Sequence, residues 1–154
     1  MPGRFENRLA EMGVTLPQAP APAANYVPYV VTGNTAYVSG QIPMQGETLL
    51  LGKLGDTMTV ETAADAARLC AINLLSQVRA ACGGDLDRLK KVVKLVGFVN
   101  STADFIDQPK VINWASDFLV ESLGDTGRHA RSAVSAASLP FGVAVEIEGI
   151  FEIS

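Results

Sequence analysis

The sequence predicts an α+β fold in which a mixed sheet carries two helices on one face. Three observations lead to this prediction: β-rich runs at both ends of the folded part, a strand near the middle that is apolar on both sides, and amphipathic helical segments between them. The 154 residues suffice for one domain with a substantial core. Hydrophobic residues make up 48% and charged residues 18% of the chain. We therefore expect an apolar surface to be buried in an oligomer.

The N-terminal segment combines a helical pattern with a proline-rich stretch. Phe5, Leu9 and Met12 recur at helical spacing before Gly13, which predicts a short helix. The proline and alanine residues that follow predict an extended connector, because proline fixes φ and keeps its predecessor out of the helical region. We expect this helix and connector to occupy residues 1–24 and the main domain to occupy residues 25–154.

The first β-rich region has the pattern of a hairpin. Two runs surround the turn Thr32–Asn34, and the second run ends in Ser39 and Gly40. A glycine at this place has two interpretations: it presents its backbone to a ligand, or it marks a bulge.

Two helices and a central strand follow. The apolar spacing predicts a helix over 59–82, with Thr59 as its N-cap and two glycines as its stop. Residues 92–99 are apolar on both faces, which is typical of a central strand; we expect Val93 to share a face with Leu95 and Val99. Ser101 fits a helix start, and the helical pattern restarts at Pro109 and ends before residue 124.

The last two strands are predicted over 131–139 and 143–153, joined as a hairpin. This register places Ser135 opposite Glu146 and Arg131 opposite Ile150. Arg131 and Glu146 are then four residues apart, or about 13 Å along the strand, which excludes a direct pair. The two side chains can meet in one site through a bulge, through convergence on a ligand, or across two subunits.

These strands carry the candidate chemistry. Arg131 shares a strand face with small residues, so its guanidinium either binds a planar carboxylate or pairs with a surface acid. His129 is either a proton carrier near neutral pH or an ordinary loop residue. Ser132 and Ser135 lack the histidine and aspartate spacing of a catalytic triad.

Charge and cysteine content exclude several classes of function. The net charge of −4 and the pI of about 4.9 argue against binding to nucleic acid, and we interpret the basic residues at 88–94 as a solvated edge. Cys70 and Cys82 lie about 18 Å apart if helical, so they cannot pair within that helix, and one histidine cannot complete a metal site with them. No stretch has the pattern of a secretory signal or a membrane span, so we expect a cytoplasmic protein without a membrane partner.

Four motifs together resemble the RidA/YjgF family of reactive-intermediate deaminases: "YVSGQIP" at 37–43, "VVKLVGFVNSTADF" at 92–105, "ARSAV" at 130–134 and "LPFGVAVEIEGIFE" at 139–152. The resemblance runs from about Asn25 to the C-terminus in the family's motif order. It implies a chorismate-mutase-like α+β fold and a homotrimer with a ligand cleft at each subunit interface. An intersubunit cleft would also explain the stagger between Arg131 and Glu146.

The resemblance also implies roles for individual residues. Arg131 matches the family's carboxylate-binding arginine, and Glu146 matches the glutamate that opens its "EIE" motif. The substrate-binding positions that it implies are Tyr26, Ser39, Gly40, Asn113, Arg131 and Ala133. Three differences point to a longer branch of the family that is often labelled endoribonuclease. The best-known members have cysteine at the place of Ala133, their "GPYSQ" is "ANYVP" here, and this chain has extra residues around Pro109 and "GDTGRH".

The resulting hypothesis is hydrolysis of a small enamine or imine, such as 2-aminoacrylate, to a 2-oxo acid and ammonia. Arg131 would hold the substrate carboxylate, and Glu146 would act as general base on water, with His129 as a possible helper. No metal or organic cofactor is expected, because an imine carbon is already electrophilic. The alternatives are a regulatory trimer that binds a small carboxylate metabolite without turnover and, with less support from the acidic composition, a ribonuclease.

Overall fold

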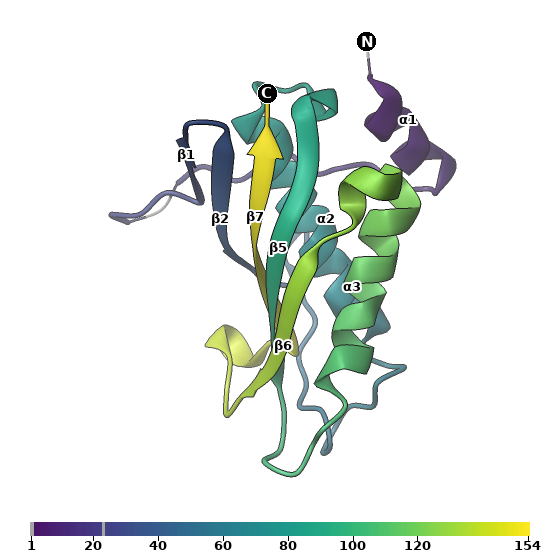
Figure 1. Cartoon of the computed structure of the whole chain (residues 1–154). Helices are drawn as coiled ribbons and strands as arrows, with labels where there is room; N and C mark the ends of the chain where they lie inside the picture. The colour runs from purple at the N-terminus through teal and green to yellow at the C-terminus, as the bar shows by residue number, and fades with distance from the viewer. Residues whose placement is uncertain (1, 23) are drawn as a thin grey trace.

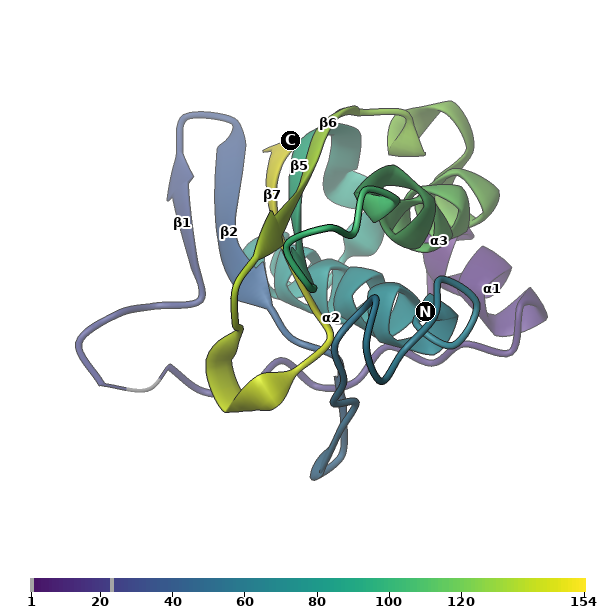
Figure 2. The ribbon, with the colours of Figure 1, turned by 90° about the horizontal axis from the view of Figure 1, so that it is seen from below.

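The computed structural model describes residues 2–22 and 24–154 and has a two-layer α+β architecture (Figure 1). A five-stranded mixed sheet has the strand order β1-β2-β7-β5-β6, and α2 and α3 cover one face (Figure 2). The predicted fold class is therefore confirmed. The strands are β1 (Tyr29–Thr32), β2 (Thr35–Gln41), β5 (Leu89–Asn100), β6 (Ala130–Ala136) and β7 (Val145–Ile153), with a separate ribbon of β3 (Met44–Gln45) and β4 (Thr48–Leu49). The helices are α1 (Arg4–Glu11), α2 (Ala64–Ala81) and α3 (Gln108–Leu123), with short 3₁₀ turns at Leu86–Arg88, Gly124–Gly127 and Pro140–Gly142.

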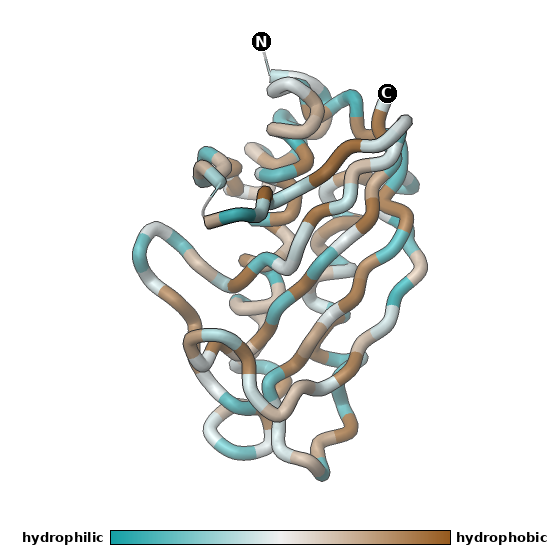
Figure 3. Tube along the Cα trace, turned by 90° about the vertical axis from the view of Figure 1, so that its left-hand side faces the viewer, coloured by the Kyte–Doolittle hydropathy of each residue, from teal (hydrophilic) through white to brown (hydrophobic). Residues whose placement is uncertain are grey.

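The core lies between the sheet and the two long helices. Residues along β7 alternate between buried and more exposed positions, which places the odd-numbered residues toward the helices and the glutamates on the uncovered face. Figure 3 shows the same alternation of apolar and polar residues along neighbouring strands. The largest fully buried side chains include Leu74 and Leu75 of α2, Ile112 and Leu119 of α3, Leu95 of β5 and Phe151 of β7.

The N-terminal helix packs onto this core. Phe5 and Leu9 are both buried and belong to the same apolar cluster as the sheet and α3. The carboxylate of Asp87 accepts hydrogen bonds from the backbone N–H groups of Arg4 (2.8 Å) and Phe5 (3.0 Å), which satisfies two donors at the start of α1. The predicted helix is confirmed, and the chain after it crosses α2 in extended form.

β5 is an interior strand, as predicted, but its faces differ from the prediction. The pairing with β7 shifts register between Val92 and Lys94, and this irregularity reverses the alternation of side chains. Val92, Leu95 and Val99 are buried, whereas Val93 is 41% exposed. The predicted common face for Val93, Leu95 and Val99 was wrong because one extra residue separates the two halves of the strand.

α2 begins later than the sequence predicts, whereas α3 begins next to the predicted restart of the helical pattern at Pro109. Thr59 and Thr62 cap each other's backbone N–H groups in a turn, and α2 itself starts at Ala64. The predicted helix start at Ser101 was wrong: residues 101–107 form a turn in which Thr102 Oγ1 donates to Asp104 at 2.7 Å. α3 starts at Gln108, where Pro109 occupies the first turn without leaving an unpaired N–H.

The last two strands are not a hairpin. β6 pairs in parallel with β5, and β7 lies between β2 and β5. The predicted pairs of Ser135 with Glu146 and of Arg131 with Ile150 were therefore wrong. The physical reason is the helical crossover from β5 through α3 to β6, which forms a parallel pair, while the turn at Pro140–Gly142 carries the chain past β5 to the far side.

Gly97 permits α3 to pack closely on β5. A Cβ atom at this position would lie 2.7 Å from Cγ1 of the buried Ile112, and a packed core has little room to relax. We expect Gly97→Ala to lower the free energy of unfolding by about 1–3 kcal/mol, measured by urea denaturation. Ser132→Ala, on the uncovered face of the neighbouring strand, is the control and should change stability little. Equal stability of both variants would contradict close packing at Gly97.

Candidate functional site

Arg131 points toward α3. Its register partner on β5 is Leu95, a buried residue on the helix side of the sheet, and partners in adjacent strands share a face. The guanidinium Nη1 donates to Asn113 Oδ1 at 2.9 Å and to Ser116 Oγ at 3.1 Å. β6 and α3 therefore bring together two of the predicted site residues, Arg131 and Asn113.

His129 extends this group through Ser116. Its Nδ1 lies 2.6 Å from the Gly127 carbonyl, which can only accept a hydrogen bond, so Nδ1 carries the proton. Nε2 of the neutral ring is then an acceptor for Ser116 Oγ at 2.9 Å. Burial, together with the positive charge of Arg131, lowers the pKa of His129 below its ordinary value, and the neutral form fits the hydrogen bonds that the ring makes. We call Asn113, Ser116, His129 and Arg131 the arginine cluster.

The charge of Arg131 is not neutralised by an acid. None of the ion pairs in the described part of the chain includes Arg131, and its hydrogen bonds go to uncharged groups. Nη2 makes only a long contact of 3.5 Å with the Pro109 carbonyl, so the edge formed by Nε and Nη2 can take a carboxylate in bidentate geometry. The arginine cluster borders a cavity of about 260 Å³, which provides room for a small anion.

Glu146 lies on the uncovered face, beside Gly40. Between Val38 and Gln41 of β2 there are two residues, whereas the facing stretch of β7 has one, Glu148. This is the predicted bulge at Gly40. A Cβ atom on Gly40 would lie 2.7 Å from the carboxyl carbon of Glu146. A glycine is therefore needed here for the Glu146 carboxylate to lie against the backbone of residue 40. We call Ser39, Gly40 and Glu146 the glutamate cluster.

The carboxylate of Glu146 is suited to accept a proton. Burial raises its pKa above the ordinary value of 4.5, and the neighbouring Glu148 raises it further. No hydrogen bond or ion pair within residues 2–22 and 24–154 includes this side chain. An unpaired carboxylate with a raised pKa is a candidate general base.

The two clusters lie on opposite faces of the sheet in one chain. Arg131 pairs with Leu95 of β5, whereas Glu146 pairs with Phe98 of the same strand. Leu95 and Phe98 are three positions apart, an odd number, so the side chains point in opposite directions. β5 also lies between the two strands that carry them. A single chain therefore does not assemble Arg131 and Glu146 into one site.

The other predicted positions are distributed between these regions. Ser39 donates to the Pro28 carbonyl through both its backbone N–H (2.9 Å) and its hydroxyl (3.1 Å). Tyr26 precedes β1 and is 64% exposed. Ala133 packs against the core beside Gly97 instead of bordering the cavity at Arg131.

Ser116 is a residue that sequence reasoning missed. It lies three positions after Asn113 on α3, so both side chains occupy one helix face. That spacing was the available signal. Ser116 connects Arg131 to His129 and fixes the orientation of both.

Residues 2–22 and 24–154 contain neither a cluster of metal-binding side chains nor a helix that could span a membrane. There, no three histidine, cysteine, aspartate or glutamate side chains gather into a group that could hold a metal ion. Cys70 and Cys82 are both buried and free. In the same part of the chain no helix is long and apolar enough to cross a membrane.

Comparison with known families decides the relationship. The family model described as "YjgF/chorismate_mutase-like, putative endoribonuclease" matches residues 6–148. The chain belongs to the YjgF/RidA family. The match begins within α1 and ends within β7, so it includes most of the N-terminal segment, both long helices and all strands up to the first residues of β7.

Individual relatives within the YjgF/RidA family extend this result. Protein TCP17 of Trypanosoma cruzi is 47% identical over 99% of this chain and 96% of its own length. The 2-iminobutanoate/2-iminopropanoate deaminase of Dermatophagoides farinae is 31% identical over 91% of this chain and 94% of its own length. In these two proteins the similarity spans nearly the whole chain.

Two solved structures differ in how closely they match. Protein Atu1372 of Agrobacterium tumefaciens has 50% identity and a TM-score of 0.92, covering 97% of this chain and 92% of its own. TdcF of E. coli with bound serine has 28% identity and a TM-score of 0.65, covering 89% of this chain and 94% of its own. The chain is thus structurally much closer to Atu1372 than to TdcF.

The raised pKa of Glu146 predicts a pH-dependent effect on stability. Between the ordinary and the raised pKa the folded state keeps a proton that the unfolded chain has released, so stability is lost as the pH rises through this range. Glu146→Gln cannot ionise and removes that loss. We expect its urea midpoint to equal or exceed that of the wild type near pH 7, with the advantage disappearing near pH 4.

The control for this measurement is Glu152→Gln, which changes an exposed carboxylate on the same strand. A midpoint for Glu146→Gln that falls below the wild-type value near pH 7 would contradict a raised pKa of the Glu146 carboxylate.

Proposed function

We propose that this protein hydrolyses small 2-imino acids, formed from enamines such as 2-aminoacrylate, to 2-oxo acids and ammonia. The observation that supports this most directly is the arginine cluster, in which Arg131 is oriented by neutral hydrogen-bond partners and keeps an unpaired edge. The deaminase name of the D. farinae relative and the serine bound to TdcF agree with a substrate in which one carbon carries both a carboxylate and a nitrogen.

In this mechanism Arg131 binds the substrate carboxylate and orients the adjacent C=N carbon. The free edge of the guanidinium provides two parallel N–H donors. Asn113 and Ser116 hold the guanidinium in place, and neutral His129 accepts a hydrogen bond from the Ser116 hydroxyl. These three residues position the arginine instead of acting on the reacting atoms.

Glu146 would act on water. Its carboxylate removes a proton as the water oxygen bonds to the imine carbon, and the nitrogen, which gains the C=N electron pair, takes up a proton from solvent. Glu146 returns its proton to the amine of the resulting carbinolamine, and ammonia leaves as the hydroxyl releases its proton to solvent and becomes the carbonyl of the 2-oxo acid. The imine carbon is electrophilic without assistance, so the proposal requires no metal or organic cofactor.

A complete site requires the arginine cluster of one chain and the glutamate cluster of another. We propose a cyclic homotrimer in which these two surfaces meet at each interface. Exposed apolar side chains on the sheet, Val30, Tyr37 and Val134, support burial of this surface in an assembly.

A second candidate function is binding of a small carboxylate metabolite without turnover. All residues of the arginine cluster come from one chain, but the Glu146 of that chain lies on the other face of the sheet. A chain that does not assemble could therefore bind a carboxylate without a general base beside it. Binding of a 2-oxo acid without release of ammonia from any imine would support this alternative.

Arg131→Ala should reduce kcat/KM for ammonia release from freshly generated 2-aminoacrylate by at least about a hundredfold relative to the wild type, after the uncatalysed rate is subtracted. The matched control is Arg128→Ala, since Arg128 borders the same cavity but already pairs with Asp125 at 3.2 Å. We expect the control to retain most of the activity. Unchanged turnover in Arg131→Ala, with normal folding, would remove Arg131 from the mechanism.

Mixing two inactive variants tests the shared site directly. If Arg131→Ala and Glu146→Gln chains assemble at random in equal amounts, about three quarters of the trimers contain both variants, and each of these has one intact site. We therefore expect about a quarter of the wild-type activity. A mixture of Arg131→Ala with the double variant is the control and should remain inactive. No recovery in the first mixture, despite mixed trimers shown by native mass spectrometry, would contradict a site shared between chains.

A further inference from the structure

His129 and Arg131 border the same cavity and are connected through one hydroxyl group. Arg131 Nη1 donates to Ser116 Oγ at 3.1 Å, and Ser116 Oγ donates to His129 Nε2 at 2.9 Å. Only this hydroxyl therefore separates the imidazole ring from the guanidinium. The cavity has a volume of about 260 Å³, so an anion that occupies it lies close to both groups.

The charges around His129 oppose its protonation. Burial lowers the pKa of His129 most, and the positive charges of Arg131 and Lys91 lower it further. α3 faces the cavity with uncharged side chains only. Asp125, in the turn before β6, is exposed and pairs with Arg128 at 3.2 Å. Among the described residues, the charged groups that act on the ring are thus both cations.

The hydrogen bonds of the ring can nevertheless accommodate a second proton. Nδ1 of His129 donates to the Gly127 carbonyl at 2.6 Å, and this bond favours the charged ring. A proton on Nε2 would point at Ser116 Oγ. That oxygen can accept from His129 and Arg131 together, because a hydroxyl has two acceptor sites, while its own proton turns to the carbonyl four residues earlier in α3. Protonation of the ring therefore leaves Arg131 held in place.

A carboxylate bound to Arg131 changes this balance of charge. It neutralises the guanidinium, which is one of the two cations that oppose protonation, and it adds a negative charge to the cavity that the ring borders. A nearby opposite charge favours the charged form of a titratable group. Because coupling between two binding events is reciprocal, a ligand that favours protonated His129 is itself bound more tightly by the protonated form.

We propose that binding of a carboxylate to Arg131 is coupled to the uptake of a proton by His129, so that the site holds the anion more tightly as the pH falls. This inference rests on the role proposed above for Arg131 in carboxylate binding. His129 then regulates the affinity of the site without contacting the reacting atoms. The product 2-oxo acid carries the same carboxylate, so its release is slower in acidic solution.

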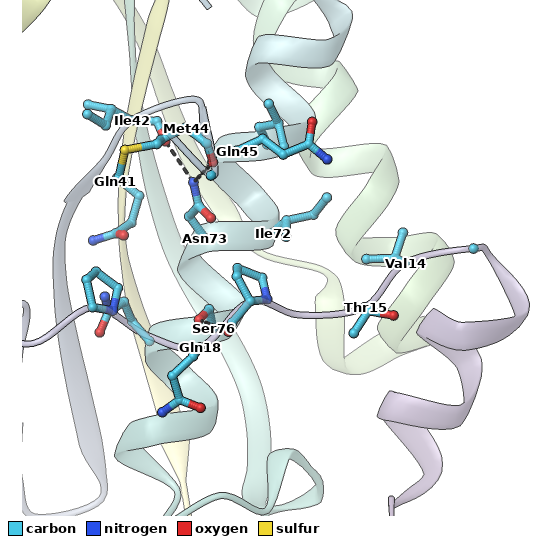
Figure 4. A pocket seen from close by; sticks show the side chains of 16 residues that line it. Val14, Thr15, Gln18, Gln41, Ile42, Met44, Gln45, Ile72, Asn73 and Ser76 are labelled. Atoms are coloured by element: carbon cyan, nitrogen blue, oxygen red, sulfur yellow. Dashed lines mark hydrogen bonds between the residues drawn. The ribbon is translucent and has the colours of Figure 1, made fainter. Parts of the chain in front are cut away.

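Another cavity, of about 410 Å³, lies between the N-terminal segment, α2 and the connection from β2 to β3 (Figure 4). None of the residues that line it is acidic, basic or a histidine. A carboxylate placed there would lose its hydration without gaining a countercharge. A small carboxylate is therefore expected to bind at Arg131, where its charge acts on His129.

The test follows the ring of His129 by NMR, and its signals are unambiguous because the chain has only one histidine. The full-length protein is titrated between about pH 5 and pH 8, with and without saturating pyruvate, a 2-oxo acid that stays ionised over this range. We expect pyruvate to raise the pKa of His129 by about one unit, and its Kd to fall at least about threefold from pH 8 to pH 5. In Arg131→Ala, the same concentration of pyruvate should leave the pKa of His129 unchanged.

Two variants separate His129 from the other carboxyl group of the proposed shared site, because the pKa of Glu146 is also raised. Glu146→Gln cannot ionise, and in this variant the Kd of pyruvate should still fall at least about threefold from pH 8 to pH 5. Adding His129→Gln to Glu146→Gln removes the remaining titratable ring, so the change in Kd should drop below about 1.5-fold.

Three outcomes distinguish this inference from the proposed function. An unchanged or lowered pKa of His129 under saturating pyruvate, with binding that depends on Arg131, would overturn the coupling but leave the deaminase mechanism. Absence of pyruvate binding at every pH would overturn both the coupling and the role of Arg131. Coupling without ammonia release from any imine would support this inference and overturn only the proposed hydrolysis.

Discussion

The parallel pairing of β5 with β6 is the interaction on which the candidate site depends. It places β5 between the strand that carries Arg131 and the strand that carries Glu146. The crossover helix α3 then covers the same side of the sheet to which Arg131 points, and provides Asn113 and Ser116 as hydrogen-bond partners. If β6 and β7 were neighbours, as in a hairpin, Arg131 would have no helix to hold it in this manner.

Charges in this molecule are kept available by neutral neighbours. Arg131 is held by an amide, a hydroxyl and a carbonyl oxygen, and burial, together with the positive charges of Arg131 and Lys91, lowers the pKa of His129. Glu146 lies beside a glycine that provides space but no countercharge. An acid paired with Arg131 would compete with a substrate carboxylate, so the absence of such a pair among the described residues is consistent with binding of an anion from outside.

α2 has two functions in the fold because its faces differ. Its apolar face contributes Leu74 and Leu75 to the core, while Asn73 and Ser76 bind backbone carbonyls of two other segments. The bond from Ser76 attaches the extended residues 14–20 to α2, and a cavity of about 410 Å³ remains beside them. The N-terminal segment thus contributes to the core through α1 and to this cavity through residues 14–20.

The sequence by itself determined the elements whose signals are local: the period of α2 and α3, the alternation along β7, and the motifs that match Arg131 and Glu146 to the YjgF/RidA family. Only the tertiary structure decided which strands pair, because hydrogen bonds between distant strands leave no signature in local spacing. The same applies to the bulge that exposes Val93, to Ser116 as the link between Arg131 and His129, and to the opposite directions of the arginine and glutamate. Each depends on the register of segments brought together by the fold.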